Sequence, residues 1–179
     1  MPIPFQDDES VQKLGFAGFL HVEFNGDAAY GALLFLNARG EPQEFVFNRL
    51  ELLNSVLWRA PDRSAGATRR LCASLFPTAT LTPQFLLFLP TLIPPQLFGG
   101  EGGIRLDIPA GAVWQSEANE PESIETFDDS GEASWVQVDW SPHPPPGDLF
   151  LLLARRGLLL EPFGRAAAGL REVYADVEF

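Results

Sequence analysis

Cysteine and histidine, the residues that most often build disulfides and zinc sites, are scarce in this sequence. Its 179 residues include one cysteine and two histidines. A single cysteine excludes an internal disulfide and agrees with a reducing cytoplasm, where we expect the protein to reside. Cys72, His21 and His143 are too few for a four-ligand structural zinc site. The sequence therefore predicts neither a metal nor a cofactor.

Long hydrophobic runs are also missing. No apolar run reaches the ~18 residues that a membrane-spanning helix needs. Prolines interrupt the best candidate, at Pro83, Pro90, Pro94 and Pro95. The first ten residues, MPIPFQDDES, are acidic and lack the basic start of a secretory signal. We therefore expect no membrane segment and no export.

The motifs of common enzyme classes are absent as well. Without a G-x-S-x-G elbow, a hydrolase triad has no anchor. The glycines at positions 99–103 lack the Lys-Ser/Thr of a P-loop, and Glu101 among them would repel phosphate. Cys72 falls within an expected helix and is interpreted as a core residue. The alternative is a nucleophile paired with His21.

Positive charge is scarce in the second half of the chain. The net charge is −12, and no lysine or arginine occurs between Arg105 and Arg155, against ten acidic residues. Such a surface repels phosphate backbones, so direct nucleic-acid binding by this half is disfavoured. A small basic patch in the first half, where seven bases accompany nine acids, stays open.

What the sequence does contain is a clear β-meander that begins at Phe16 and extends over residues 16–48. The segments FAGFLHVEF, AYGALLFLN and QEFVFNRLE alternate or run apolar as strands do. The turn at Asn25–Asp27 and the turn around Gly40 supply residues that tolerate positive φ. These features predict three consecutive antiparallel strands.

The rest of the chain predicts helices and further strands. A helix is expected after the break at Pro61, capped by Asp62 or Ser64 and ended by Pro77. Residues 50–59 fit either a helix or an extended segment. The remaining predicted elements are strands at 84–89, 104–108 and 112–115, a turn at 109–111, a strand at 134–140, a helix at 149–156 capped by Asp148, a strand at 158–160 and a helix from Pro162.

The predicted fold class is α+β. It consists of an N-terminal antiparallel meander extended to a mixed sheet of about six to eight strands, with three or four helices on one side. Residues 1–179 are expected to form a single domain, with an arm at 1–14 and an acidic flexible loop at 116–133.

Two sets of residues are candidates for binding. Arg49, Glu51, Trp58 and Arg59 follow the end of the third strand and have the residue types of interface anchors. The alternative is a surface ion pair between Arg49 and Glu51 and a core position for Trp58. Three tryptophans flank the acidic loop: Trp114, Trp135 and Trp140. They are expected to pack the late strands unless they form an exposed aromatic platform.

These observations predict a non-catalytic accessory or adaptor subunit that acts by binding a protein partner. The first alternative is a metal-dependent hydrolase that uses Glu23, Glu44 and Glu51 with His21, which requires these groups to converge. The second is an acidic mimic of nucleic acid, with residues 107–139 occupying a basic groove of a target. The partner and the oligomeric state are not predicted.

Overall fold

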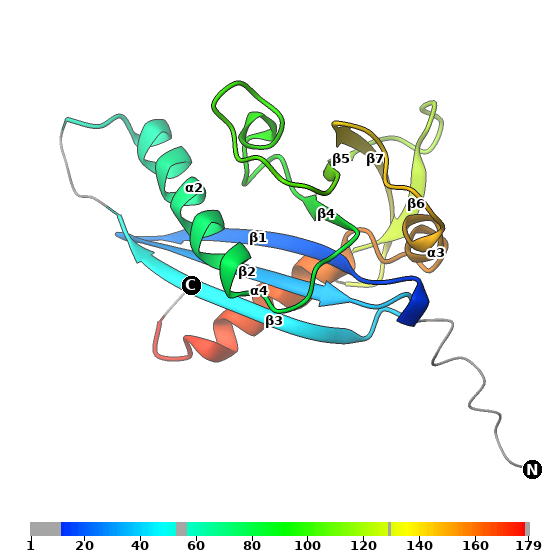
Figure 1. The fold of residues 1–179 in the computed structure, drawn as a ribbon, viewed down its shortest axis with the longest axis horizontal. Coiled ribbons are helices and arrows are strands. Elements are labelled where there is room, and N and C mark those ends of the chain that lie inside the picture. The colour runs from blue at the N-terminus through cyan, green and yellow to red at the C-terminus, as the bar shows by residue number, and fades with distance from the viewer. Residues whose placement is uncertain (1–11, 53–56, 129, 178–179) are drawn as a thin grey trace, which may run out of the picture.

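A computed structural model describes residues 12–52, 57–128 and 130–177, which form a seven-stranded mixed sheet with helices on both faces (Figure 1). The order of strands across the sheet is β3-β2-β1-β4-β5-β7-β6. The strands are β1 (Ala17–Asn25), β2 (Ala28–Leu36), β3 (Pro42–Glu51), β4 (Phe85–Phe88), β5 (Ala110–Gln115), β6 (Ile124–Phe127) and β7 (Ala133–Ser141). The helices are α2 (Ala60–Thr78), the 3-10 turn η1 (Pro95–Leu97), α3 (Leu149–Arg155) and α4 (Glu161–Val173). This arrangement confirms the predicted α+β class.

The predicted meander is confirmed strand by strand. β1 pairs with β2, and β2 with β3, both antiparallel. Gly26 has a φ of +57° and Gly40 a φ of +79°, the left-handed conformation that makes glycine favourable in tight turns. The third strand runs to Glu51, so the first residues of the ambiguous segment 50–59 are extended. Residues 53–56 and most of the predicted N-terminal arm fall outside the described residues.

The centre of the sheet is parallel. After β3 the chain crosses the sheet through α2 and returns as β4, which lies parallel to β1 and to β5. All four residues of β4 are buried, as a central strand covered on both faces requires. This also confirms the strand predicted at 84–89.

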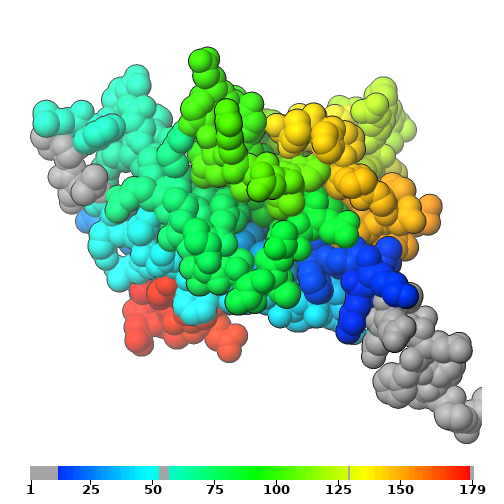
Figure 2. Space-filling model, viewed as in Figure 1, coloured from blue at the N-terminus to red at the C-terminus, as the bar shows by residue number. Residues whose placement is uncertain are grey.

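Two hydrophobic clusters lie on opposite faces of the sheet. On one face α2 packs against β2 and β3 and contributes Leu71, Cys72 and Leu75. The segment after β4, green in Figure 2, stands over the same face and adds Ile93, Leu97 and Phe98 to the cluster. On the other face lie α3 and α4 (Figure 1). The prediction that all helices lie on one side was therefore wrong.

Helix α2 begins and ends at different residues from those predicted. Its N-cap is Arg59, not Asp62 or Ser64, and Pro61 lies in the first turn. A proline is favourable there because the first backbone N–H groups have no partner inside the helix. Pro77 lies within the last turn and does not end the helix. No helix among the described residues is long and apolar enough to cross a membrane.

The late elements also differ from the prediction. The segment 104–108 forms one isolated bridge between Ile104 and Phe98, and residues 110–111 belong to β5. The acidic segment 116–133 contains a strand, β6, whose Thr126 is fully buried and accepts a hydrogen bond from the backbone N–H of Leu159 at 3.1 Å. The predicted strand at 158–160 is a turn between α3 and α4. Short apolar runs did not distinguish these alternatives.

Cys72 is expected to be inert in the folded protein. Its side chain is fully buried, and burial raises the pKa of the thiol to about 12, so the reactive thiolate is scarce at neutral pH. His21 lies on the opposite face of the sheet, so the two cannot pair. We expect no labelling by an aromatic disulfide reagent at pH 8, and complete labelling in denaturant. Rapid labelling of the native protein would contradict this packing.

Candidate ligand pocket beside helix α2

The four residues predicted to bind a partner lie at two separate places. Arg49 and Glu51 form an ion pair at 2.6 Å on β3, and the Arg49 guanidinium lies 5.7 Å from the ring centre of Tyr30. Tyr30 belongs to the cluster on the α4 face. Trp58 and Arg59 precede α2, and Trp58 is 59% exposed. The constellation is therefore divided, and Trp58 is not a core residue.

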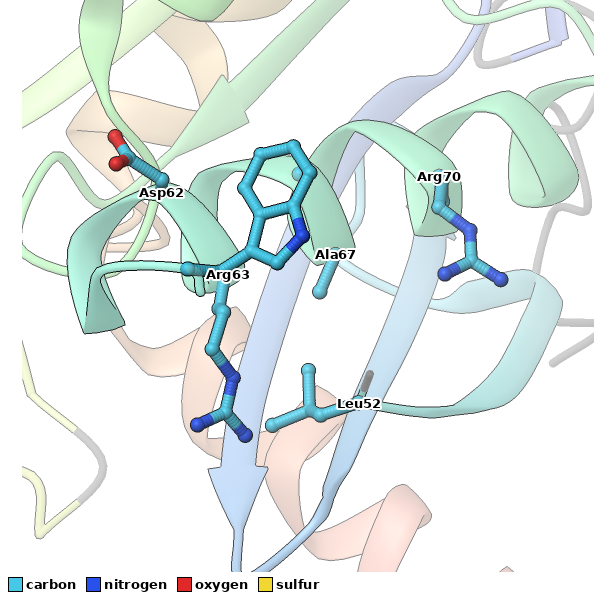
Figure 3. A pocket seen from close by; sticks show the side chains of 7 residues that line it. Leu52, Asp62, Arg63, Ala67 and Arg70 are labelled. Atoms are coloured by element: carbon cyan, nitrogen blue, oxygen red, sulfur yellow. The ribbon is translucent and has the colours of Figure 1, made fainter. Parts of the chain in front are cut away.

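Trp58 instead lines a small pocket beside the N-terminal half of α2. The cavity measures about 190 Å³. Figure 3 shows the Arg63 and Arg70 side chains extending from α2 on either side of Leu52 and Ala67. Because residues 63, 67 and 70 are separated by three or four positions, they share one side of the helix. Leu52 comes from the chain just after β3, so the pocket lies where the strand and the helix meet.

The charge of this pocket is positive and unneutralised within the described residues. Arg59 holds Asp62 through two hydrogen bonds, at 2.7 and 3.2 Å, and the Asp62 carboxylate points away from the other two arginines (Figure 3). Arg63 and Arg70 have no acidic partner among residues 12–52, 57–128 and 130–177. The Nε atom of Arg63 is buried without a hydrogen-bond acceptor. A buried donor of this kind is costly unless something else accepts its hydrogen bond.

Chemically, the pocket combines an apolar floor, an indole ring and two guanidinium groups. Guanidinium groups match the geometry of phosphate and carboxylate, and can bind them through paired hydrogen bonds. Tryptophan offers a flat face for an aromatic ring. The arrangement therefore suits a ligand that joins an anionic group to a flat ring.

The sequence did not single out Arg63 and Arg70, although a signal was present. The two arginines are seven positions apart with Ala67 between them, which is the spacing of one helix face. Trp58 was grouped with Arg49, Glu51 and Arg59, so the arginines of the helix were not considered as its partners.

A second polar cluster lies on the other face, at the carboxyl end of the parallel pair β1 and β4. His21 Nε2 and Glu23 Oε1 are 2.8 Å apart, and Arg171 of α4 reaches Glu23 at 3.4 Å. The hydrogen bond from His21 is the main cause that lowers the pKa of Glu23, and Arg171 adds to it. His21 Nδ1 is buried without a partner in the described structure. This cluster attaches α4 to β1.

The four groups of the proposed hydrolase do not converge. Glu44 lies on the α2 face, where its carboxylate accepts hydrogen bonds from the backbone N–H groups of Thr80 and Leu81, both at 2.8 Å. Although desolvation opposes the effect, these bonds lower the pKa of Glu44. Glu51 is engaged by Arg49. In the described part of the chain no three His, Cys, Asp or Glu side chains could hold a metal ion, so we derive no metal-dependent step.

Comparison with known proteins identifies the fold. No family model matches the sequence, and no curated protein matches it. The structure is similar to the crystal structure of an Endonuclease V from Bacillus subtilis, with a TM-score of 0.57 and 10% sequence identity. The likeness covers 92% of this chain and 83% of the other.

This likeness shows a shared fold and corrects the functional prediction. The prediction of a non-catalytic adaptor subunit was wrong, because it rested on missing motifs, while the chain has the fold of an endonuclease.

Proposed function

We propose that this protein binds nucleoside phosphates, free or within a single strand of nucleic acid, in the pocket beside α2. The buried Nε–H of Arg63 is the observation that carries the proposal, because it requires an acceptor that the described residues do not supply. The likeness to an endonuclease over most of the chain supports a nucleic-acid ligand over other anions with an aromatic ring.

Each part of a nucleoside phosphate has a complementary group in the pocket. Arg63 and Arg70 bind the phosphate, and the exposed indole of Trp58 stacks on the base. Stacking of a base on an aromatic side chain contributes about 1–3 kcal/mol. The apolar surfaces of Leu52 and Ala67 cover the edge of the ring.

The size and surroundings of the pocket favour a short ligand. A volume of about 190 Å³ is below the ~300 Å³ at which drug-sized ligands are enclosed, so the pocket holds part of one nucleotide and leaves the rest exposed. The net charge of −12 opposes a long polyanion lying across the rest of the surface. The positive charge is concentrated on α2, which carries Arg63, Arg69 and Arg70 against Asp62.

The proposal predicts that the double substitution Arg63→Gln and Arg70→Gln weakens binding at least about tenfold. Each hydrogen bond to a charged group contributes ~1.5–3 kcal/mol before solvent screening. A loss of ~1.4 kcal/mol already corresponds to a tenfold weaker affinity. The probes are 5′-AMP and a ten-residue oligodeoxythymidine, titrated calorimetrically at 50 mM and 200 mM NaCl. Comparing the affinities for the two probes distinguishes a free nucleotide from a nucleic-acid strand as the ligand.

A matched control separates the pocket from net charge. Arg105→Gln with Arg155→Gln removes two exposed arginines elsewhere and is expected to change the affinity less than about twofold. Equal losses in the two double variants, or no binding of either probe by the wild-type protein, would overturn the proposal.

A further inference from the structure

Trp114 of β5, which is exposed, and Trp135 of β7, which is half-buried, lie on the same face of the sheet. On β5, Trp114 lies on the same face as Ala110 and Ala112, because side chains alternate along a strand. Trp114 is directly opposite Gln137 of β7, and Trp135 is two residues along that strand on the same face. Residues in such diagonal positions lie about 7–8 Å apart, within reach of indole rings.

None of the helices α2, α3 and α4 packs on this part of the face; the segment with η1 packs on the same face, in one cluster with Ala110 and Ala112 of β5. Helix α2 packs on β2 and β3, while α3 and α4 contribute their buried residues to the cluster on the opposite face. Trp114 is 40% exposed. Trp140 differs, because it faces the opposite side and makes edge contacts with Phe85 and Phe150. The predicted aromatic set is therefore divided into Trp140, which packs against the core on one face, and a platform on the other face formed by the exposed Trp114 and the half-buried Trp135.

Carboxylates surround this platform. Glu125 of β6 is directly opposite Trp135, and Asp139 of β7 is opposite Ala112, so both lie on the platform face. The loop before β6 brings Glu120 to the same place, since the Gln137 side-chain amide donates to the Pro121 carbonyl at 2.9 Å and to the Glu120 carboxylate at 3.3 Å.

These carboxylates have no cationic partner in the described residues. No ion pair involves Glu120, Glu125 or Asp139. The sequence explains this, because no lysine or arginine occurs between Arg105 and Arg155. The platform is therefore an aromatic surface in a negative field, on which an anion or a phosphate backbone is repelled.

We infer that this platform binds a linear polyamine, an organic polycation with several alkylammonium groups. An ammonium group over an indole is attracted by the ring, and tryptophan is the best of the aromatic side chains for this contact. The methylene chain between the ammonium groups covers apolar ring surface. The carboxylates on β6, on β7 and in the loop before β6 can each bind a further ammonium group, since adjacent strands lie about 4.8 Å apart.

The chemistry favours this ligand over a metal ion. A divalent cation needs several oxygen ligands around one point, and no such group of three exists among the described residues. An organic ammonium instead uses carboxylates that are spread around a flat aromatic surface. The site does not depend on the proposed function, because it uses none of the residues beside α2.

The experiment is a calorimetric titration with spermidine in 50 mM NaCl, compared with tetramethylammonium and with NaCl alone. We expect Trp114→Leu to weaken spermidine binding about tenfold and Trp114→Phe to weaken it less, because phenylalanine retains part of the cation–π contact. Phe24→Leu is the matched control: it removes an exposed aromatic ring from β1, outside the platform, and should leave the affinity unchanged.

Charge variants test whether binding is localised. Asp139→Asn should weaken spermidine binding, whereas Glu172→Gln, which removes the same charge from α4, should not. Equal effects of the two variants would show attraction to net charge only and overturn the proposal. Binding of an oligoarginine peptide through Trp114 with no binding of spermidine would also overturn it.

Discussion

Replacing Phe163 by alanine is expected to destabilise the protein by about 3–5 kcal/mol, the usual cost of removing a buried phenyl ring. Phe163 is 3% exposed, and its ring meets that of Phe19 on β1 edge to face, with centres 5.5 Å apart. The substitution removes an aromatic contact between α4 and β1 and leaves a cavity behind. Since domains are stable by about 5–15 kcal/mol, this loss is a large share of the total.

Urea unfolding followed by circular dichroism measures this effect. Val173→Ala on the same helix is the control, because Val173 is 42% exposed and its loss should cost less than about 1 kcal/mol. Similar midpoints for the two variants would contradict the docking of α4 on β1. A large loss in Phe163→Ala alone would confirm that this face of the sheet is closed by α4.

The meander and the buried central strand could be predicted because their patterns are local. Alternation in β1, the apolar run of β2 and the glycine turn at Gly40 each specify their own conformation within a few residues. β4 was predictable for a related reason, since a short apolar segment bounded by prolines fits a strand covered on both faces.

The distribution of helices over the two faces could not be predicted in this way. An apolar stripe on α4 indicates that one side of the helix is buried. It does not indicate which face of the sheet the helix covers. That choice depends on which face of β1 carries Phe19, and so on contacts between residues more than a hundred positions apart. Dependence on distant contacts also explains why β6 was assigned to a loop. Thr126 is buried beside the turn at Leu159, whose backbone N–H donates a hydrogen bond to the Thr126 hydroxyl, and these two residues are 33 positions apart.

The candidate pocket was only partly predictable. Trp58 was identified as an anchor type, but its partners come from α2 and from Leu52, which the turn between strand and helix brings together. Arg49 and Glu51 were chosen because they lie at the end of the third strand, where grooves form, and the alternation of β3 directs them to the face opposite Leu52. A position at a strand end therefore did not determine which of these side chains share a face.

Glu23 is expected to make the stability of the protein depend on pH in the acid range. Its carboxylate accepts a hydrogen bond from His21 and pairs with Arg171, while Tyr30 lies opposite on β2 and Arg49 stacks on Tyr30 from β3. The folded protein thus lowers the pKa of Glu23 below its ordinary value of 4.5. A lowered carboxylate pKa stabilises the folded state above that ordinary value, and the stabilisation is lost as the pH falls through the folded pKa.

Glu23→Gln removes the stabilisation that comes from the charge of Glu23. At pH 7 we expect the variant to lose about 1.5–3 kcal/mol, the range for a hydrogen bond to a charged group, because the Glu23 side chain is only 17% exposed. The difference between wild type and variant should shrink as the pH falls below about 4.5, since protonation removes the same charge from the wild-type protein. Glu172→Gln on α4 is the control and should give a small difference at every pH. A loss in Glu23→Gln that stayed constant from pH 7 to pH 3 would mean that Glu23 acts through packing alone, and that its charge does not attach α4 to β1.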